Sequence, residues 1–321
     1  MIKTLIFSKD RALQLRSTLD SFYLHCHDAN KTTIFVVYTN SSETCQAQYN
    51  KLEDLYREQG NLFFIQEKDF RSTVLQLLNP FKSGHFLFKA YQLIISIHPR
   101  INKTLNIGHW LTNKNQHPLR DNHILFLVDD NIFIRDFSLS EAVQTLTQHP
   151  QAIGFSLRLG RNTNFSYMAN TYQNLPEFQT ASPNGNILKF QWTNGEYDFG
   201  YPLEVSSSIY RLKDILPLIL GIRFNTPNFL EGHMAQRANK FLKLLPELLC
   251  YQESVTFCNP INLVQNVSAN RAGSSVSLST QALARLFDEG YSVDVEKYIG
   301  FTPNSCHQEV ELRIKKRDQH A

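Results

Sequence analysis

The chain has 321 residues, with 32 basic and 29 acidic side chains and a formal net charge of +3. This balance excludes the strongly basic surface that is typical of nucleic-acid-binding proteins. Hydrophobic residues make up 42% of the sequence, which is enough for a sizeable core and excludes a disordered chain. The length allows two domains, or one α/β domain with additions.

The cysteines and the N-terminus indicate the compartment. The five cysteines form no CxxC pair and their number is odd, so neither a disulfide framework nor a zinc site is indicated. No signal peptide is visible, because Met1–Lys3 leads directly into an apolar run. Apolar stretches such as Ile215–Ile222 are too short to span a bilayer. We therefore predict a cytoplasmic protein without a transmembrane segment, with peripheral membrane contact through the basic run Arg313–Asp318 as a minor alternative.

The first part of the chain alternates short apolar runs with amphipathic segments. Strands are predicted at Thr4–Phe7, Thr33–Tyr38 and Leu62–Ile65, and helices at Ala12–Leu24 and Glu43–Gln59. The polar loop Ser8–Arg11 joins the first strand to the first helix. Three such strand–helix units imply parallel strands joined by right-handed crossovers. We therefore predict an α/β fold with a central, mostly parallel sheet flanked by helices.

The stretch His123–Phe137 carries the strongest functional signal. Its apolar run Ile124–Val128 predicts a strand that is buried on both faces. Asp129, Asp130 and Asn131 follow it directly. Adjacent carboxylates repel each other and lose hydration, so a nearby cation would offset the cost. Ligands bind at the carboxyl ends of strands in open α/β sheets, where divalent cations take carboxylate oxygens together with substrate phosphates. A solvated turn is the alternative, since Asp and Asn also form turns.

The second part of the chain has a less regular pattern. A helix is predicted at Ser138–Gln148, capped by Ser138 or Ser140, and a strand at Ala152–Leu159. Gly160–Pro183 is rich in Asn, Tyr and Phe and forms either a substrate-facing insertion or a long surface loop. Further strands are predicted at Ile187–Trp192, Leu203–Arg211 and within Ser254–Val264, and further helices at Leu212–Leu220, Phe229–Leu242 and Thr280–Glu289. The tail beyond Gly300 shows little pattern.

The order of these features resembles that of the GT-A fold nucleotide-sugar glycosyltransferases of the bacterial family-2 type. Phe7–Arg11 resembles the nucleotide-side loop of that family, and Leu127–Asn131 resembles its Asp-x-Asp motif. Tyr197–Pro202 and Asn228–Glu231 stand where acceptor-side motifs are expected. The likeness extends to about residue 270. It implies a donor-binding half at residues 1–137, an acceptor half of the same domain at 138–270, and a C-terminal helix and tail at 271–321.

The resemblance implies an enzyme that moves a sugar from a nucleotide-sugar donor to an acceptor hydroxyl, assisted by Mn²⁺ or Mg²⁺. Asp130 and Asn131 would bind the metal, although the family's motif has an acidic residue at the position of Asn131. The residues implied to face the nucleotide-sugar are Ser8, Asp10, Arg11, Asn40, Asp129 and Arg271. The acceptor would be a glycan, a lipid-linked sugar or a small molecule. A nucleotidyltransferase of related fold and a non-catalytic nucleotide- or sugar-binding module are the alternatives.

An inverting enzyme also needs a general base for the acceptor hydroxyl. Glu231 is the first candidate and Asp198 the second. For Glu231 the alternative is a capping box with Asn228 at the start of a helix, and for Asp10 it is a helix N-cap. The candidate acceptor-binding residues are Trp192, Tyr197 and Tyr201. Their amphipathic rings suit sugar faces, although packing in the core is equally open to them.

Overall fold

The computed structural model describes residues 2–79, 122–262, 273 and 278–316. A central sheet in these residues has nine strands in the order β3-β2-β1-β4-β11-β6-β12-β10-β9. Its strands are β1 (Ile2–Lys9), β2 (Thr32–Thr39), β3 (Leu62–Gln66), β4 (His123–Val128), β6 (Ala152–Ser156), β9 (Gln179–Thr180), β10 (Ile187–Gln191), β11 (Ser208–Arg211) and β12 (Glu247–Tyr251). The neighbours β3, β2, β1 and β4 are all parallel, as predicted. Beyond β4 the sheet is mixed, because β11 runs antiparallel to both of its neighbours.

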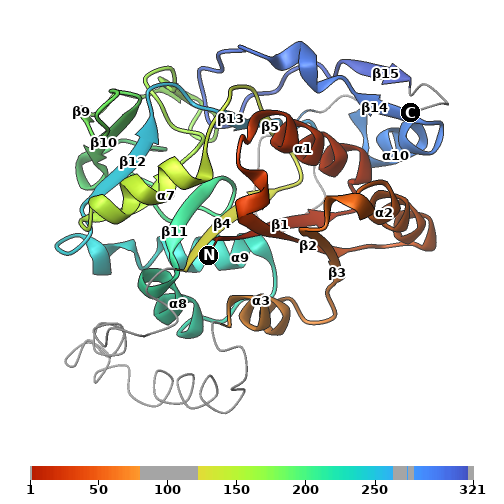
Figure 1. Cartoon of the computed structure of the whole chain (residues 1–321), viewed down its shortest axis with the longest axis horizontal. Helices are drawn as coiled ribbons and strands as arrows, with labels where there is room; N and C mark the ends of the chain where they lie inside the picture. The colour runs from red at the N-terminus through yellow and green to blue at the C-terminus, as the bar shows by residue number, and fades with distance from the viewer. Residues whose placement is uncertain (1, 80–121, 263–272, 274–277, 317–321) are drawn as a thin grey trace.

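Helices cover both faces of this sheet (Figure 1), which confirms the predicted α/β class. On one face lie α1 (Ala12–His25), α2 (Glu43–Leu55), α7 (Leu139–Gln148) and α10 (Thr280–Asp288), and on the other α3 (Phe70–Leu78), α8 (Leu212–Leu220) and α9 (Pro227–Ala235). Alternate residues of β1 serve the two cores, because successive side chains of a strand point to opposite faces. Ile6 packs into the first core, whereas Leu5 and Phe7 pack into the second.

The register of the parallel strands determines where the polar loops meet. Phe7 of β1 is paired with Val128 of β4, so Ser8 and Asp129 leave the sheet at the same edge. The Ser8 hydroxyl donates to Asp129 Oδ2 at 2.9 Å, across 121 residues of sequence. The first polar loop and the acidic stretch therefore lie at one edge of the sheet.

Two features of the central sheet differ from the sequence prediction. Leu203–Arg211 is a strand only at Ser208–Arg211, because the Glu204 carboxylate accepts from the backbone nitrogens of Ser206 and Ser207 and folds this stretch into a turn. No strand was expected at Glu247–Tyr251, yet β12 lies inside the sheet between β6 and β10.

The tail beyond Gly300 also has more structure than its pattern indicates. Here β15 (Ile314–Lys316) pairs with β14 (Tyr291–Val293), and α10 and β14 pack on α1. A second small sheet joins β5 (Asn131–Phe133) to β13 (Thr256–Cys258) directly after the acidic stretch.

Within the described ranges, no helix is long and apolar enough to cross a bilayer. The predicted division into donor half, acceptor half and tail stays a prediction, as does the cytoplasmic location.

Candidate active site

A cavity of 1160 Å³ lies at the edge of the sheet where β1, β2 and β4 end. Its polar lining from the first part of the chain includes Ser8, Lys9, Arg11, Thr39, Glu67, Asp129 and Asp130. Its lining from the second part includes Arg158, Tyr167, Tyr197, Asp198, Tyr201, Glu231 and His307. The cavity therefore brings the nucleotide-side and acceptor-side candidates of the sequence to one place.

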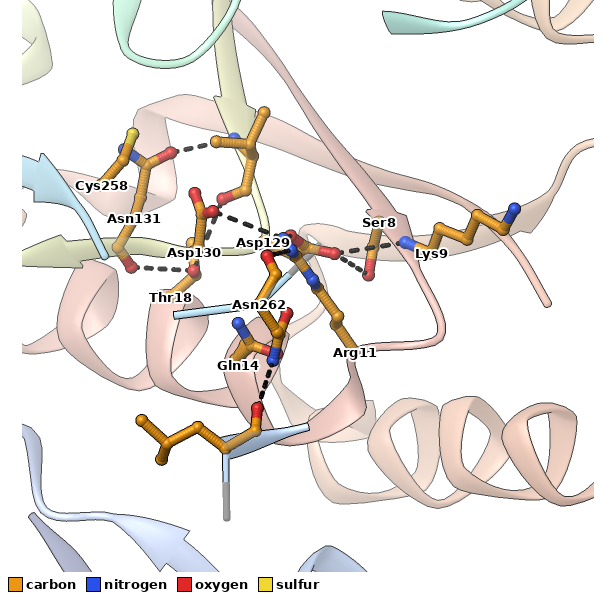
Figure 2. Close-up of polar contacts among 12 residues, drawn as sticks. Ser8, Lys9, Arg11, Gln14, Thr18, Asp129, Asp130, Asn131, Cys258 and Asn262 are labelled. Atoms are coloured by element: carbon orange, nitrogen blue, oxygen red, sulfur yellow. Dashed lines mark hydrogen bonds and ion pairs between the residues drawn. The ribbon is translucent and has the colours of Figure 1, made fainter. Parts of the chain in front are cut away.

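Asp129 is held by the loop that follows β1 (Figure 2). Its Oδ2 accepts from Ser8 Oγ at 2.9 Å and from the Lys9 backbone nitrogen at 3.2 Å, and its Oδ1 accepts from Arg11 Nη1 at 3.0 Å. The Asp129 side chain is 6% exposed, so a buried charge is paired and hydrogen-bonded at both oxygens. This carboxylate thus fixes the loop Ser8–Arg11 against the end of β4.

Arg11 is the cation that the adjacent carboxylates require. Its Nη1 donates to Asp129 Oδ1 at 3.0 Å and to Asp130 Oδ2 at 3.3 Å, and its Nη2 donates to the backbone oxygen of Asn262. Burial would lower the pKa of Arg11, but Asp129 and Asp130 outweigh it and raise the pKa above its usual value. The chain itself therefore offsets part of the repulsion between the two carboxylates.

Asp130 points toward the cavity, and its side chain is less buried than that of Asp129. Its side chain is 14% exposed, compared with 6% for Asp129. Burial and the charge of Asp129 raise the pKa of Asp130 to about 6, against the opposing effect of Arg11. A cavity-lining carboxylate whose ionised form is costly is suited to meet an additional cation.

Asn131 is engaged by the protein rather than by the cavity. Its Oδ1 accepts from the Val128 backbone nitrogen at 2.9 Å, and its Nδ2 donates to Cys258 Sγ at 3.5 Å. The Thr18 hydroxyl donates to the Asn131 backbone oxygen at 2.8 Å. The side chain is fully buried and does not line the cavity. Asn131 is thus a buried residue at the start of β5 whose amide binds back to Val128 and to Cys258, and not the solvated turn residue given as the alternative.

The cavity residues could bind only a divalent cation whose ligands come mainly from the substrate. Among the described residues, no group of three or more His, Cys, Asp or Glu side chains could hold a metal. One cavity-lining carboxylate, Asp130, nevertheless matches the way Mg²⁺ is bound beside substrate phosphates, through one or two carboxylates and water.

Glu231 lies on α9, whose start differs from the one predicted. The N-cap is Thr226, whose hydroxyl accepts from the Phe229 backbone nitrogen, so the capping box of Asn228 with Glu231 is wrong. The Glu231 carboxylate instead accepts from the Val205 backbone nitrogen at 2.9 Å and from the Tyr201 hydroxyl at 3.3 Å. Burial raises the pKa of Glu231, against the opposing charge of Arg158. Both hydrogen bonds orient it as an acceptor at the cavity wall.

Asp198 reaches the cavity from a tight loop. A Cβ atom at Gly195 would come within 2.5 Å of the Phe199 backbone, so the loop closes only because residue 195 is glycine. The Asp198 backbone nitrogen donates to Gln173 Oε1 at 3.1 Å, and Gln173 Nε2 lies 3.5 Å from Asp198 Oδ2. Burial raises the pKa of Asp198, against the effect of Arg158. Asp198 therefore has an environment similar to that of Glu231.

Arg158 and His307 are cavity residues that the sequence pattern did not single out. Arg158 follows β6 and is 4% exposed; its Nη1 donates to Ser206 Oγ at 2.8 Å, and its Nε lies 3.9 Å from Glu204 Oε1. A lone arginine in the apolar run Ala152–Leu159 was the available signal. His307 comes from the tail without pattern; burial lowers its pKa to about 3, so it is neutral near pH 7.

The other predicted site residues divide into four groups. Tyr197 and Tyr201 line the cavity, whereas Trp192 is buried in the core, where its Nε1 donates to the Leu245 backbone oxygen at 2.7 Å. Arg271 lies outside the described residues.

Asp10 and Asn40 form the fourth group, at the edge of the site and outside the cavity lining. Asp10 has a φ of 55° and accepts from the Ser41 backbone nitrogen at 2.8 Å. The N-cap position of α1 is Arg11, so the N-cap alternative for Asp10 is wrong. Asn40 donates to the Ser42 backbone oxygen at 3.0 Å.

Comparison with solved structures gives low similarity. TarS of S. aureus, residues 1–349 in complex with UDP, has a TM-score of 0.42 and 14% identity, over 79% of this chain and 59% of that chain. The bifunctional glycosyltransferase WbbM has a TM-score of 0.32 and 13% identity, over 74% of this chain and 36% of that chain. Mouse xyloside xylosyltransferase 1 has a TM-score of 0.29 and 13% identity, over 75% of this chain and 76% of that chain. At these values the likeness carries no functional argument.

Comparison of sequences gives a stronger match. No protein-family model matches the chain. The chain is 26% identical over 317 residues to the bifunctional glycosyltransferase pgtA of Dictyostelium discoideum, which covers 92% of this chain and 36% of that protein. The chain thus spans about a third of the length of the curated relative that it matches. This match confirms the resemblance to glycosyltransferases that the motifs of the chain indicate.

Proposed function

We propose that the chain is a glycosyltransferase that moves a sugar from a nucleotide-sugar to an acceptor hydroxyl. One observation carries the proposal: Asp130 with Arg11 on one side, and Glu231 with Asp198 on the other, line a single cavity at the carboxyl edge of the sheet. Ligands bind at this edge in open α/β sheets. The similarity to a bifunctional glycosyltransferase supports the reaction class.

The donor is proposed to lie against the first part of the chain. Phe7 and Val37 give this wall of the cavity an apolar surface for a nucleoside, and Thr39 and Glu67 add polar groups beside it. Arg11 carries positive charge at the end of β4, where a diphosphate would meet Asp130, and Lys9 adds a second cationic residue to the cavity lining. A divalent cation at Asp130, when bound, would neutralise charge on the leaving diphosphate. We expect no ligation by Asn131, because both ends of its amide are already engaged.

The acceptor is proposed to lie against the second part of the chain. Its hydroxyl oxygen forms a bond to the anomeric carbon of the sugar while the bond from that carbon to the diphosphate oxygen breaks. The hydroxyl proton passes to the Glu231 carboxylate, which is oriented by Val205 and Tyr201. Because burial raises the pKa of Glu231, this carboxylate is a stronger base than an exposed one. Asp198 is the second candidate for the same role.

The test is release of nucleoside diphosphate from a panel of UDP-, GDP-, dTDP- and ADP-sugars, with and without a pool of sugar acceptors. We expect one donor to be turned over, and Asp130→Asn and Glu231→Gln to lose transfer. The matched controls are Asp54→Asn and Glu53→Gln, at exposed positions of α2. A nucleotidyltransferase would instead release pyrophosphate from a nucleoside triphosphate and a sugar phosphate, and a binding module would turn over neither substrate. Either result would overturn the proposal.

A further inference from the structure

A second, smaller cavity adjoins the active-site cavity. It has a volume of 290 Å³, and we call it the outer pocket. It is lined by Phe165, Tyr167, Tyr172, Asn304, Ser305, His307, Gln308 and Glu309. Tyr167 and His307 also line the active-site cavity, so these two side chains stand between the two spaces. Their rings lie 6.3 Å apart, centroid to centroid.

Two segments with little sequence pattern build the outer pocket together. One is the hairpin of β7 (Phe165–Ser166) and β8 (Thr171–Tyr172), within the segment described above as either a substrate-facing insertion or a surface loop. The other is residues 304–309 of the tail. The Phe165 backbone nitrogen donates to the Asn304 oxygen at 2.9 Å, and the Tyr167 backbone nitrogen donates to Ser305 Oγ at 3.2 Å.

The pocket is anchored on the active-site side as well. The Tyr167 hydroxyl donates to Glu309 Oε1, and the backbone at His307 pairs with Cys258 at the end of β13. Since β13 pairs with β5 directly after the acidic stretch, the position of the outer pocket is fixed relative to Asp130. A ligand that spans both spaces would therefore be held in a defined orientation.

The chemistry of the outer pocket suits a sugar ring. Tyr172 is 75% exposed, and its ring meets Phe165 edge-on, with centroids 5.4 Å apart and an angle of 81°. Gln308 Oε1 accepts from the Asn304 backbone nitrogen at 3.0 Å, which holds this amide in place. Within the described part of the chain, Gln308 Nε2 and the Asn304 side-chain amide make no hydrogen bond to protein. An exposed aromatic ring beside such amides offers an apolar face with donors and acceptors for hydroxyl groups.

The charge and the volume of the outer pocket restrict the class of ligand further. None of the lining residues is Lys or Arg, and Glu309 is acidic, so a phosphate or carboxylate group has no Lys or Arg partner in this pocket. The volume of 290 Å³ is at the lower end of the usual range for ligand sites, which is about 300–1,000 Å³. This space admits one group of monosaccharide size.

We propose that the outer pocket binds the second sugar unit of the acceptor, next to the unit whose hydroxyl is glycosylated. This inference rests on the proposed function, and it specifies the acceptor class as a neutral disaccharide, or a longer glycan or glycoconjugate. Tyr172 contacts the second unit through its ring, and Asn304 and Gln308 bind its hydroxyl groups. The terminal unit lies beyond Tyr167 and His307, in the active-site cavity.

The experiment compares p-nitrophenyl monosaccharides with p-nitrophenyl disaccharides that carry the same terminal sugar, using the donor found in the hydrolysis panel. For wild type we expect a lower KM for the disaccharide of the accepted terminal sugar. Tyr172→Ala should raise that KM about two- to tenfold, the scale of one aromatic contact. Tyr172→Phe should restore it, because the ring remains. Monosaccharide KM and donor hydrolysis should not change, and Tyr291→Ala on β14 serves as the tyrosine control outside both cavities.

The two possible failures are distinguishable. If wild type hydrolyses a donor but handles mono- and disaccharides alike, the outer pocket is not an acceptor subsite and the proposed function stands. An equal rise in KM for both acceptors in Tyr172→Ala also overturns the inference, since the effect then arises in the active-site cavity. If no nucleotide-sugar is turned over, the proposed function fails, and this inference fails with it.

Discussion

Arg11 Nη1 lies 3.3 Å from Asp130 Oδ2, so the carboxylate proposed to meet the metal is already paired with a cation of the chain. The same nitrogen binds Asp129, which is buried more deeply and hydrogen-bonded at both oxygens. The two adjacent aspartates therefore have different tasks. Asp129 stabilises the loop after β1, and Asp130 is the aspartate that we propose to meet a ligand in the cavity.

The first prediction concerns Asp130. Asp130→Ala should abolish transfer and metal-dependent binding of a nucleoside diphosphate, because Asp129, the other carboxylate that Arg11 binds, already accepts hydrogen bonds from the Ser8 hydroxyl and the Lys9 backbone nitrogen. The measurement is calorimetry with nucleoside diphosphates in the presence of Mn²⁺ and in the presence of EDTA. Asp54→Ala, an exposed change, is the control. Unchanged Mn²⁺-dependent affinity in Asp130→Ala would remove Asp130 from the metal site.

The second prediction concerns Asn131. Asn131→Asp would bury a third carboxylate and remove the donor to Cys258 Sγ, so it should destabilise the fold rather than complete a metal site. A buried polar group left without its partner costs about 1–3 kcal/mol, and a charged group more. Burial raises the folded-state pKa of an acid, so this loss of stability should grow as pH rises from the unfolded pKa of about 3.9 to that raised pKa, stay constant above it, and shrink on acidification. Urea unfolding at pH 5 and pH 8 measures it, with Asn131→Ala as the uncharged control.

The donor side of the site could be predicted from the sequence because its signals are local. An apolar run ending in Asp129 and Asp130 predicts a buried strand with carboxylates at its end, and parallel crossovers place Ser8 at the same edge. The structure adds long-range contacts that the spacing of residues in the sequence does not predict. The pairing of Arg11 with both carboxylates joins residues that are 118 and 119 positions apart.

The acceptor side was less predictable for the same physical reason. Glu231 was found as a candidate, but its partners Val205 and Tyr201 come from another segment, and the local pattern favoured a capping box instead. Arg158 looked like one residue of a strand, although it is the buried cation beside Glu204. The strand β12 was missed because its five buried residues begin with a glutamate and follow a proline.

A third prediction tests the start of α7. The Asp28 carboxylate accepts from the Ser138 hydroxyl and, at 2.8 Å each, from the backbone nitrogens of Leu139 and Ser140. Asp28→Ala should cost about 1–3 kcal/mol of unfolding free energy, the scale of hydrogen bonds to a charged group. Although burial opposes it, hydrogen bonding lowers the folded-state pKa of Asp28. Its contribution should therefore be present above the unfolded pKa of about 3.9 and be lost as pH falls through the folded pKa.

The measurement is urea unfolding of Asp28→Ala and wild type at pH 7 and at about pH 2.5, below the ordinary Asp pKa. The difference between the two proteins should narrow in acid. Glu53→Ala, on the exposed face of α2, should leave the midpoint unchanged at both values. If the difference in unfolding free energy between the two proteins is the same in acid, the hydrogen bonds stabilise the fold without the carboxylate charge.

The fourth prediction concerns the general base. Glu231→Gln should slow transfer by about 10²–10⁴-fold, the usual scale for general base catalysis. A glutamine oxygen still accepts from the Val205 backbone nitrogen, so the melting temperature should change little. Donor binding should also persist, because the donor is proposed to lie on the other wall of the cavity. Retained turnover with an inverted product would exclude Glu231, and Asp198→Asn is then the next variant to measure. A product with retained anomeric configuration would need no such base.

The last prediction uses the charge that surrounds this carboxylate. Burial raises the pKa of Glu231 and Glu204 raises it further, whereas Arg158 and the donors Val205 and Tyr201 lower it. If ionised Glu231 is the base, kcat/KM falls as pH drops through its pKa. Arg158→Gln removes the lowering charge, so this acidic limb should move to higher pH by about one unit or more, the scale of a neighbouring opposite charge. Glu204→Gln should move the limb to lower pH, and Arg161→Gln, at an exposed arginine nearby, should not move it.

A purely structural role of Arg158 would lower the rate at every pH without moving the limb. Opposite movements in the Arg158 and Glu204 variants would therefore identify a carboxylate influenced by both charges as the base, and loss of the limb in Glu231→Gln would assign it to Glu231 rather than Asp198.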